Sequence, residues 1–72
     1  MPPVHVSVVS PEEAYNGNAE FWCGRDLAAI TVLHEGKLQL RIDPRRDGEP
    51  WLLDTDSLAA GLAEATRLIA AY

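Results

Sequence analysis

The sequence predicts a single small α+β domain, in which an antiparallel sheet of about three strands packs against one C-terminal α-helix. Three observations support this class. Residues 4–9 alternate in polarity, residues 27–42 form two apolar segments joined by Glu35-Gly36, and residues 56–71 carry apolar side chains at three- and four-residue steps. A period of two is typical of strands and the longer period of helices. The predicted order is therefore strand, loop, hairpin, loop, helix.

Size limits how this domain can be stabilised. The 72 residues, 47% hydrophobic and 24% charged, suit one globular domain over residues 1–72. A single core of this size rarely supplies more than about 3–5 kcal/mol without a disulfide, a metal or a second subunit. Cys23 is the only cysteine, and with His5 and His34 it matches no zinc-site spacing, so we expect no metal and no cofactor. A second copy of the chain, or another protein, is the remaining source of stability.

Charge and targeting signals narrow the compartment and the partners. Six basic residues against eleven acidic ones give a net charge of −5, which disfavours nucleic acid. No apolar stretch reaches the roughly 18 residues of a membrane span. Met1-Pro2-Pro3 leads directly into the alternating segment without the basic start of a signal peptide. We therefore expect a cytoplasmic protein with no membrane contact, and the scarcity of lysine beside Ala, Leu and Arg suggests a bacterial source.

The first half of the chain predicts one strand and one turn of helix. In residues 4–9, the valines at 4, 6 and 8 share one face, and His5 lies on the other. Ser10-Pro11 followed by Glu13 matches a capping box, which predicts a helical turn. Asn16-Gly17-Asn18 then ends it. Residues 20–23 fit either a short edge strand or a packed loop.

The register of the hairpin decides which side chains face the helix, because a slip of one residue moves every side chain to the opposite face. A two-residue loop at Glu35-Gly36 would pair His34 with Lys37 and mix polar with apolar side chains on both faces. A three-residue loop with Gly36 in the left-handed conformation pairs Leu33 with Lys37 instead. We predict the three-residue loop, because it gathers one apolar face from both strands. The predicted buried face comprises Ala28, Ile30, Val32, Leu38, Leu40 and Ile42, and the predicted solvent face comprises Ala29, Thr31, Leu33, Lys37, Gln39 and Arg41.

The second half of the chain predicts a loop followed by the helix. Residues 43–50 contain prolines, a glycine and alternating charges, which predicts a loop. We expect the Trp51 side chain that follows to be buried in the core, where it would join the loop to the sheet. Residues 54–57 offer several N-cap candidates for a helix from about 56 to 71. Gly61 would let the helix approach the sheet closely, although glycine costs about 1 kcal/mol relative to alanine. The predicted apolar stripe comprises Leu58, Gly61, Leu62, Ala65, Leu68, Ile69 and Tyr72.

Cys23, between Trp22 and Arg25, admits two interpretations. As a thiol activated by Arg25, it would serve an enzyme or a small-ligand site. As a small buried hydrophobe beside aromatic residues, it would have an ordinary structural role in the core. The sequence places no base beside it, so we favour the structural interpretation and expect no catalytic residue. Asp54 and Asp56 match no calcium-loop pattern and are better explained by helix capping.

The remaining candidate site is a basic row with an aromatic residue near it. Positive charge gathered on one face, with the acidic residues elsewhere in the chain, suits docking to a complementary protein. The alternative is that these charges only keep an edge strand from aggregating. The leading hypothesis is a small non-catalytic protein-interaction or regulatory module that binds another protein or itself. The alternatives are a ligand-binding protein or thiol enzyme that uses Trp22, Cys23 and Arg25, and a nucleic-acid regulator that uses the basic residues. The candidate surface comprises Lys37, Gln39, Arg41, Arg45, Arg46 and Trp22.

Overall fold

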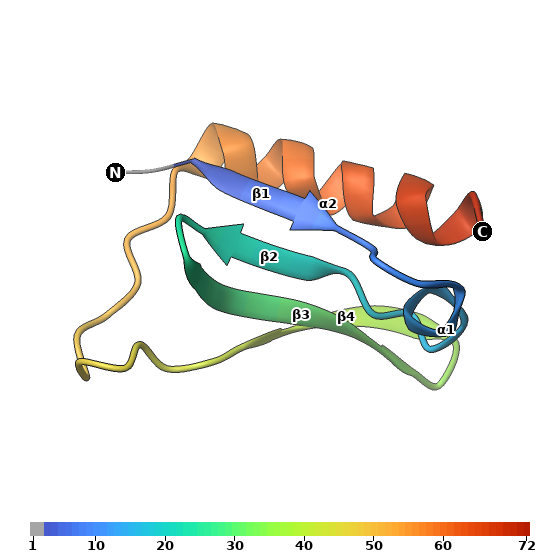
Figure 1. Cartoon of the computed structure of the whole chain (residues 1–72), viewed down its shortest axis with the longest axis horizontal. Helices are drawn as coiled ribbons and strands as arrows, with labels where there is room; N and C mark the ends of the chain where they lie inside the picture. The colour runs from blue at the N-terminus through green and yellow to red at the C-terminus, as the bar shows by residue number, and fades with distance from the viewer. Residues whose placement is uncertain (1–2) are drawn as a thin grey trace.

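A four-stranded antiparallel sheet forms the centre of the fold, and one long helix covers part of it (Figure 1). The computed structural model describes residues 3–72, so Met1 and Pro2 of the signal-peptide argument lie outside the described residues. The predicted α+β class is confirmed, with four strands where the sequence indicated about three. The elements are β1 (Val4–Ser7), α1 (Pro11–Tyr15), β2 (Glu20–Cys23), β3 (Asp26–His34), β4 (Lys37–Ile42) and α2 (Thr55–Ala70), and the strands follow chain order across the sheet.

The additional strand is β2, which lies between β1 and β3 and is not an edge strand. Phe21 pairs with Ala29 while Trp22 pairs with Leu27, so the register shifts and leaves Ala28 as a bulge residue. Phe21 is almost fully buried beneath α2. Because successive side chains of a strand alternate, Trp22 points to the opposite face of the sheet.

The short helix α1 begins as its capping residues predict. The Ser10 hydroxyl accepts a hydrogen bond from the Glu13 backbone N–H at 3.1 Å, and the Glu13 carboxylate accepts one from the Val9 backbone N–H at 2.8 Å. Gly17 then turns the chain with a φ of 72° and is buried beside Leu33. A Cβ at Gly17 would lie 2.9 Å from the Leu33 Cβ, so this turn requires glycine.

The β3–β4 hairpin has a two-residue loop, so the predicted three-residue register is wrong. His34 pairs with Lys37. Glu35 and Gly36 both have positive φ, 52° and 79°, which is the combination of a type I′ turn. Such a turn matches the right-handed twist of the flanking strands, and this backbone preference outweighs the pattern of side chains.

The corrected register redefines the two faces of the sheet. We call the face toward α2 the inner face and the opposite one the outer face. Ile30 and Val32, predicted to be buried against the helix, lie on the outer face. Ala29, Thr31 and Leu33, predicted to be solvated, lie on the inner face. The inner face comprises Val4, Val6, Phe21, Cys23, Ala29, Thr31, Leu33, Leu38, Leu40 and Ile42, and the outer face comprises His5, Ser7, Glu20, Trp22, Leu27, Ile30, Val32, His34, Lys37, Gln39 and Arg41.

The core lies between the inner face and α2, nearest to β1 and β2. Asp54 caps α2 by accepting the Ser57 backbone N–H at 2.8 Å, which places the helix one residue earlier than predicted. Gly61 and Ala65 are buried, but Leu62 and Tyr72, predicted on the apolar stripe, are exposed at the margin of the contact. The cluster comprises Val4, Ala19, Phe21, Ala29 and Ala65, with Val6, Val8, Leu40, Leu53, Leu58 and Ile69 packed against it.

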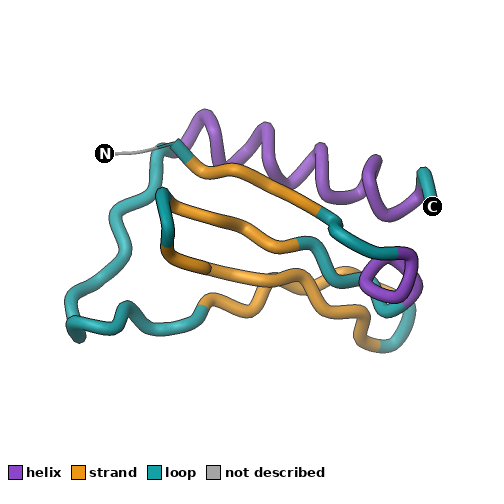
Figure 2. The backbone as a smooth tube through the Cα atoms, viewed as in Figure 1, coloured by secondary structure: helices purple, strands orange, loops and turns teal. Residues whose placement is uncertain are grey.

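A long loop over residues 43–54 carries the chain from the end of β4 to the start of α2 (Figure 2). The Trp51 indole N–H donates to the Asp43 carbonyl oxygen at 2.6 Å, so this side chain joins the loop to the end of the sheet as predicted. It is only half-buried and lies outside the core cluster, so the prediction that it fills the core is wrong. In the part of the chain described, neither helix has the length and apolar character that a membrane crossing requires.

Candidate functional site

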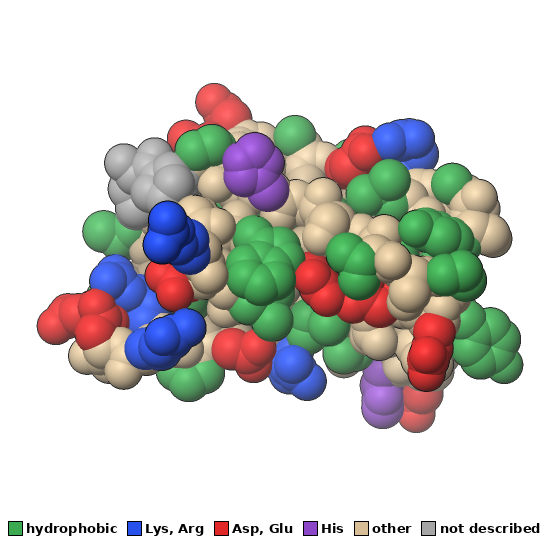
Figure 3. All heavy atoms as spheres, in the orientation of Figure 1, with side chains coloured by type: hydrophobic (Ala, Val, Ile, Leu, Met, Phe, Trp, Pro, Cys, Tyr) green, Lys and Arg blue, Asp and Glu red, His purple; other side chains and the backbone are tan. Residues whose placement is uncertain are grey.

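The outer face of the sheet has no helix over it, because α2 packs against the inner face. Trp22, Ile30 and Val32 occupy the middle of the outer face on β2 and β3, and each is only partly buried. In Figure 3, hydrophobic side chains gather at the centre of the face turned toward the viewer, with charged side chains around them. We call these three residues the apolar patch. They form a group of large apolar side chains that stays partly accessible, because no helix of residues 3–72 packs over this face.

Trp22 is held in place at one end of the apolar patch. Its indole N–H donates to a Glu20 carboxylate oxygen at 3.0 Å, two residues earlier on the same face. A hydrogen bond with the Glu13 carboxyl and partial burial raise the pKa of Glu20 above its usual range, and the bond from Trp22 opposes this rise. This bond orients the indole ring on the outer face, and tryptophan is enriched at the energetic centres of protein-binding sites.

The predicted basic row lies along β4, on the same face as the apolar patch. Lys37, Gln39 and Arg41 are exposed on the outer face, as expected. The Arg41 guanidinium donates to an Asp43 carboxylate oxygen at 3.1 Å, so part of its charge is neutralised. Among residues 3–72, no carboxylate forms an ion pair with Lys37. The row therefore offers one uncompensated charge and one paired charge beside the patch.

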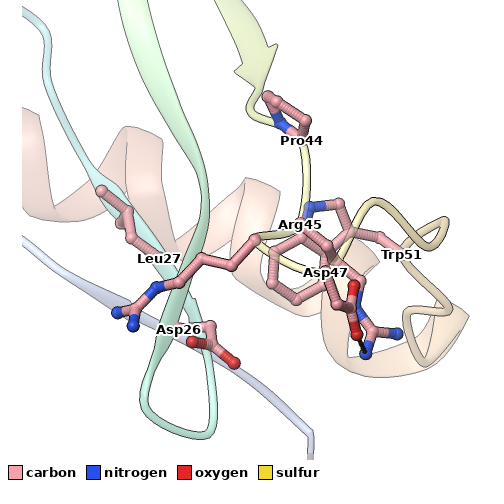
Figure 4. A pocket seen from close by; sticks show the side chains of 7 residues that line it. Asp26, Leu27, Pro44, Arg45, Asp47 and Trp51 are labelled. Carbon is pink, nitrogen blue, oxygen red and sulfur yellow. Dashed lines mark hydrogen bonds and ion pairs between the residues drawn. The ribbon is translucent and has the colours of Figure 1, made fainter.

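Arg45 and Arg46, the other predicted basic residues, belong to a separate site at the long loop. The Arg45 guanidinium lies 5.7 Å from the centroid of the Trp51 ring and donates to an Asp47 carboxylate oxygen at 2.6 Å (Figure 4). The Glu49 backbone N–H and then Arg45 hold the pKa of Asp47 below its usual range. These contacts fold Arg45 onto its own loop. The loop encloses a hollow of about 240 Å³ lined by Asp26, Leu27, Pro44, Arg45, Arg46, Asp47 and Trp51.

The candidate thiol segment does not converge on one cavity. Cys23 is buried on the inner face, Trp22 lies on the outer face, and Arg25 is exposed in the turn after β2. The alternation of side chains along β2 separates the first two, and Gly24 with a φ of 65° turns the third away. The thiol hypothesis stays a prediction that this geometry does not favour.

Sequence reasoning found the basic row and Trp22 but assigned Ile30 and Val32 to the core. The signal that could have found them is Gly36, because glycine at the second position of a two-residue loop suits a type I′ turn. Glu35 gave no such signal, because a positive φ is uncommon for glutamate. That loop places Ile30 and Val32 on the same face as Lys37.

Chemistry that depends on a bound metal has no cluster to support it in residues 3–72, where no three His, Cys, Asp or Glu side chains gather. Comparison with protein-family models, with curated proteins and with solved structures found no match. The geometry of the outer face is therefore the main guide to function.

Proposed function

We propose that this protein is a small non-catalytic interaction module that binds a partner protein through the outer face of its sheet. The observation that supports this proposal is the apolar patch of Trp22, Ile30 and Val32, which lies on a face with no helix over it. Large apolar side chains grouped on a surface and rimmed by polar residues are typical of protein-binding sites. A cytoplasmic location belongs to the same proposal, supported by the single cysteine.

The charges around the apolar patch indicate the chemistry of the partner. Lys37 and Arg41 border it along β4, and Glu20 borders it on β2. A partner that places an acidic group against β4 and an apolar side chain against Trp22 would match this arrangement. Charges at such a rim fix orientation and accelerate association more than they add affinity. Binding should therefore slow at high ionic strength, while the apolar contact persists.

The partner can be another protein or a second copy of the chain, and both belong to this proposal. Binding of nucleic acid is a weaker alternative, because Arg41 and Arg45 are each paired with an aspartate and lie at different sites. The small-ligand and thiol-enzyme alternative also remains a prediction. Rapid alkylation of Cys23 in the folded protein would revive it, since the buried thiol should react slowly.

A photo-crosslinking residue at Val32 tests the proposal most sharply. Val32 lies on the outer face of β3, an interior strand of the sheet, opposite Gln39 of β4. Irradiated in the cells that produce the protein, this variant should form a covalent adduct of defined mass with a partner. The matched control carries the same crosslinker at Ala63, which is exposed on α2. The control should not form that adduct.

Two further changes separate specific docking from incidental contact. Trp22→Ala combined with the Val32 crosslinker should greatly reduce the adduct, because the indole ring is removed. Lys37→Glu should reduce its rate of formation at low salt more than at high salt. Equal adducts from the Val32 and Ala63 positions, or none from Val32, would contradict the proposal.

A further inference from the structure

The sheet has one edge that is open to another strand. At the other edge, the Val4 backbone N–H of β1 donates to the Ser57 hydroxyl at 3.0 Å, so the start of α2 covers it. β4 is the last strand in the order and pairs without interruption with residues 29–34 of β3. It contains no proline and no bulge, which are two devices that commonly protect an edge strand. Ile42, near its end, is 57% exposed.

The free backbone groups of β4 can be assigned from the pairing. Asp43 donates its backbone N–H to the Ala28 carbonyl oxygen at 2.9 Å, so its backbone groups point toward β3. Backbone groups alternate in direction along a strand, so every second residue before Asp43 also points toward β3. The residues whose N–H and C=O point to the open edge are therefore Leu38, Leu40 and Ile42.

The geometry points to a second copy of this chain as the occupant of that edge, with the two β4 strands paired antiparallel around Leu40. In this register Leu40 faces its own copy and Leu38 faces Ile42 of the second copy, so all the outward backbone groups find partners. Lys37 then lies opposite Asp43 of the second copy, whose carboxylate also accepts from its own Arg41, and so gains an ion pair that residues 3–72 of its own chain do not give it. Such a two-fold contact is closed and joins two four-stranded sheets into one.

Charge selects this register over its neighbours. Centring the pair on Gln39 would place Lys37 opposite Arg41 of the second copy, and centring it on Arg41 would place that residue opposite itself. Like charges directly opposite each other destabilise a strand pair. Centring on Leu40 instead places Gln39 opposite Arg41, so neither position meets a like charge. Lys37 and Arg41 would therefore repel a strand that placed basic residues opposite them, but they meet no like charge when β4 of a second copy pairs around Leu40.

This inference deepens the self-association half of the proposed function and rests on it, but it uses the edge of β4 and not the apolar patch. A charge-swap experiment measured by sedimentation equilibrium tests it. The unmodified protein should be a dimer at micromolar concentration. Lys37→Glu and Asp43→Lys should each weaken the dimer by about tenfold, because each change opposes like charges at two contacts. An equimolar mixture of the two variants should recover the dimer, because every such contact in the mixed pair joins a lysine to an acid.

Backbone variants at Ile42 test the same register without changing charge. Ile42→Pro removes an N–H that points to the open edge, so it should weaken the dimer while leaving the β3 pairing intact. Ile42→Val retains the N–H and should leave the dimer unchanged. Circular dichroism should show that both variants fold.

The outcomes separate this inference from the proposed function. A dimer that is indifferent to the charge swap and to Ile42→Pro would overturn the β4 pairing and leave self-association standing. A protein that stays monomeric at high micromolar concentration would overturn both the β4 pairing and the self-association half. The Val32 crosslinking experiment would then decide docking to another protein independently.

Discussion

Thr31 occupies a buried position on the inner face that an alternating strand would usually give to an aliphatic side chain. Its hydroxyl donates to the Gly17 carbonyl oxygen at 2.7 Å and accepts the Ala19 backbone N–H at 2.7 Å. The Asn18 side-chain amide also donates to the Thr31 carbonyl oxygen at 2.9 Å. These bonds attach the loop after α1 to β3, so the polarity of Thr31 identifies a loop-anchoring residue and not a solvent-facing one.

Thr31→Val should destabilise the protein by about 2–3 kcal/mol, because it leaves a buried N–H and a buried carbonyl without partners. Urea unfolding measures the difference. Thr66→Val is the matched control, since the Thr66 hydroxyl is exposed on α2 and makes only a long contact of 3.5 Å with the Leu62 carbonyl oxygen. The control should change stability by about 0.5 kcal/mol or less. Equal effects at the two positions would refute the anchoring role.

Glu20 makes the stability of the fold depend on pH through its contact with Glu13. Because the pKa of Glu20 is raised in the folded state, the folded protein retains this proton to a higher pH than the unfolded chain. Both states are protonated well below the ordinary glutamate pKa, so the shift has no effect there. As pH rises from about 4.5 through the folded-state pKa, the unfolded state loses its proton first and the protein loses stability.

Glu20→Gln should therefore gain stability relative to the unmodified protein as pH rises through this window. The glutamine oxygen can still accept the Trp22 indole N–H, so the variant isolates the contact between the two carboxyls. Urea unfolding at about pH 4.5 and pH 7 measures the change. A difference between the two proteins that stays constant over this range would contradict the prediction.

At the scale of whole elements, the contact between α2 and the sheet depends on Gly61. A Cβ at this position would lie 2.8 Å from Val6 Cγ2 and 3.3 Å from Phe21 Cε2. Phe21 is nearly fully buried, so its ring has little room to move away. The sequence predicted this close approach from a glycine within the apolar stripe, and the structure confirms it.

Gly61→Ala tests whether packing or helix propensity dominates at this position. Alanine should gain about 1 kcal/mol from propensity, but crowding in a packed core costs about 1–3 kcal/mol. We expect a net loss of about 1 kcal/mol in the free energy of unfolding. Ala59→Gly at an exposed position of α2 gives the propensity contribution alone. A net gain in stability for Gly61→Ala would show that the helix does not approach β1 and β2 as closely as described.

The elements were predictable where a local signal determined them. Ser10 and Asp54 have side chains that satisfy helix-start N–H groups, and both helices begin after them. For β2, the sequence left a strand and a packed loop as alternatives. The segment has only four residues, and it forms a strand because β1 and β3 pair with it on both sides. Such non-local pairing leaves little trace in four residues.

The hairpin register was not predictable from polarity alone. The side-chain argument assumed that a polar Thr31 must face water and that Ile30 must be buried. The first assumption fails because the Thr31 hydroxyl forms hydrogen bonds within the protein and does not need water. The second fails because Ile30 lies on the outer face, away from α2. Backbone conformation at Glu35-Gly36 then decides the register. Sequence and structure therefore disagree at the face that carries the candidate site.

The molecule as a whole is a sheet whose two faces differ in how far the helix covers them. The inner face packs beneath α2 mainly at β1 and β2, and Leu33 and Ile42 at its other end are exposed. The outer face leaves Trp22, Ile30 and Val32 partly accessible beside the basic row. Four residues of the predicted surface, Lys37, Gln39, Arg41 and Trp22, share this face. Arg45 and Arg46 lie apart from them, because the long loop joins Trp51 to the end of the sheet.

The measurement that tests this account most directly is the set of cross-strand nuclear Overhauser contacts in the β3–β4 hairpin. In the observed register, the α-protons of Thr31 and Leu40 lie opposite each other, as do those of Leu33 and Leu38. Strong contacts between the α-protons of these two pairs are the expected result. Contacts of Thr31 with Gln39 and of Leu33 with Lys37 would instead return Ile30 and Val32 to the helix side, and the apolar patch would no longer exist.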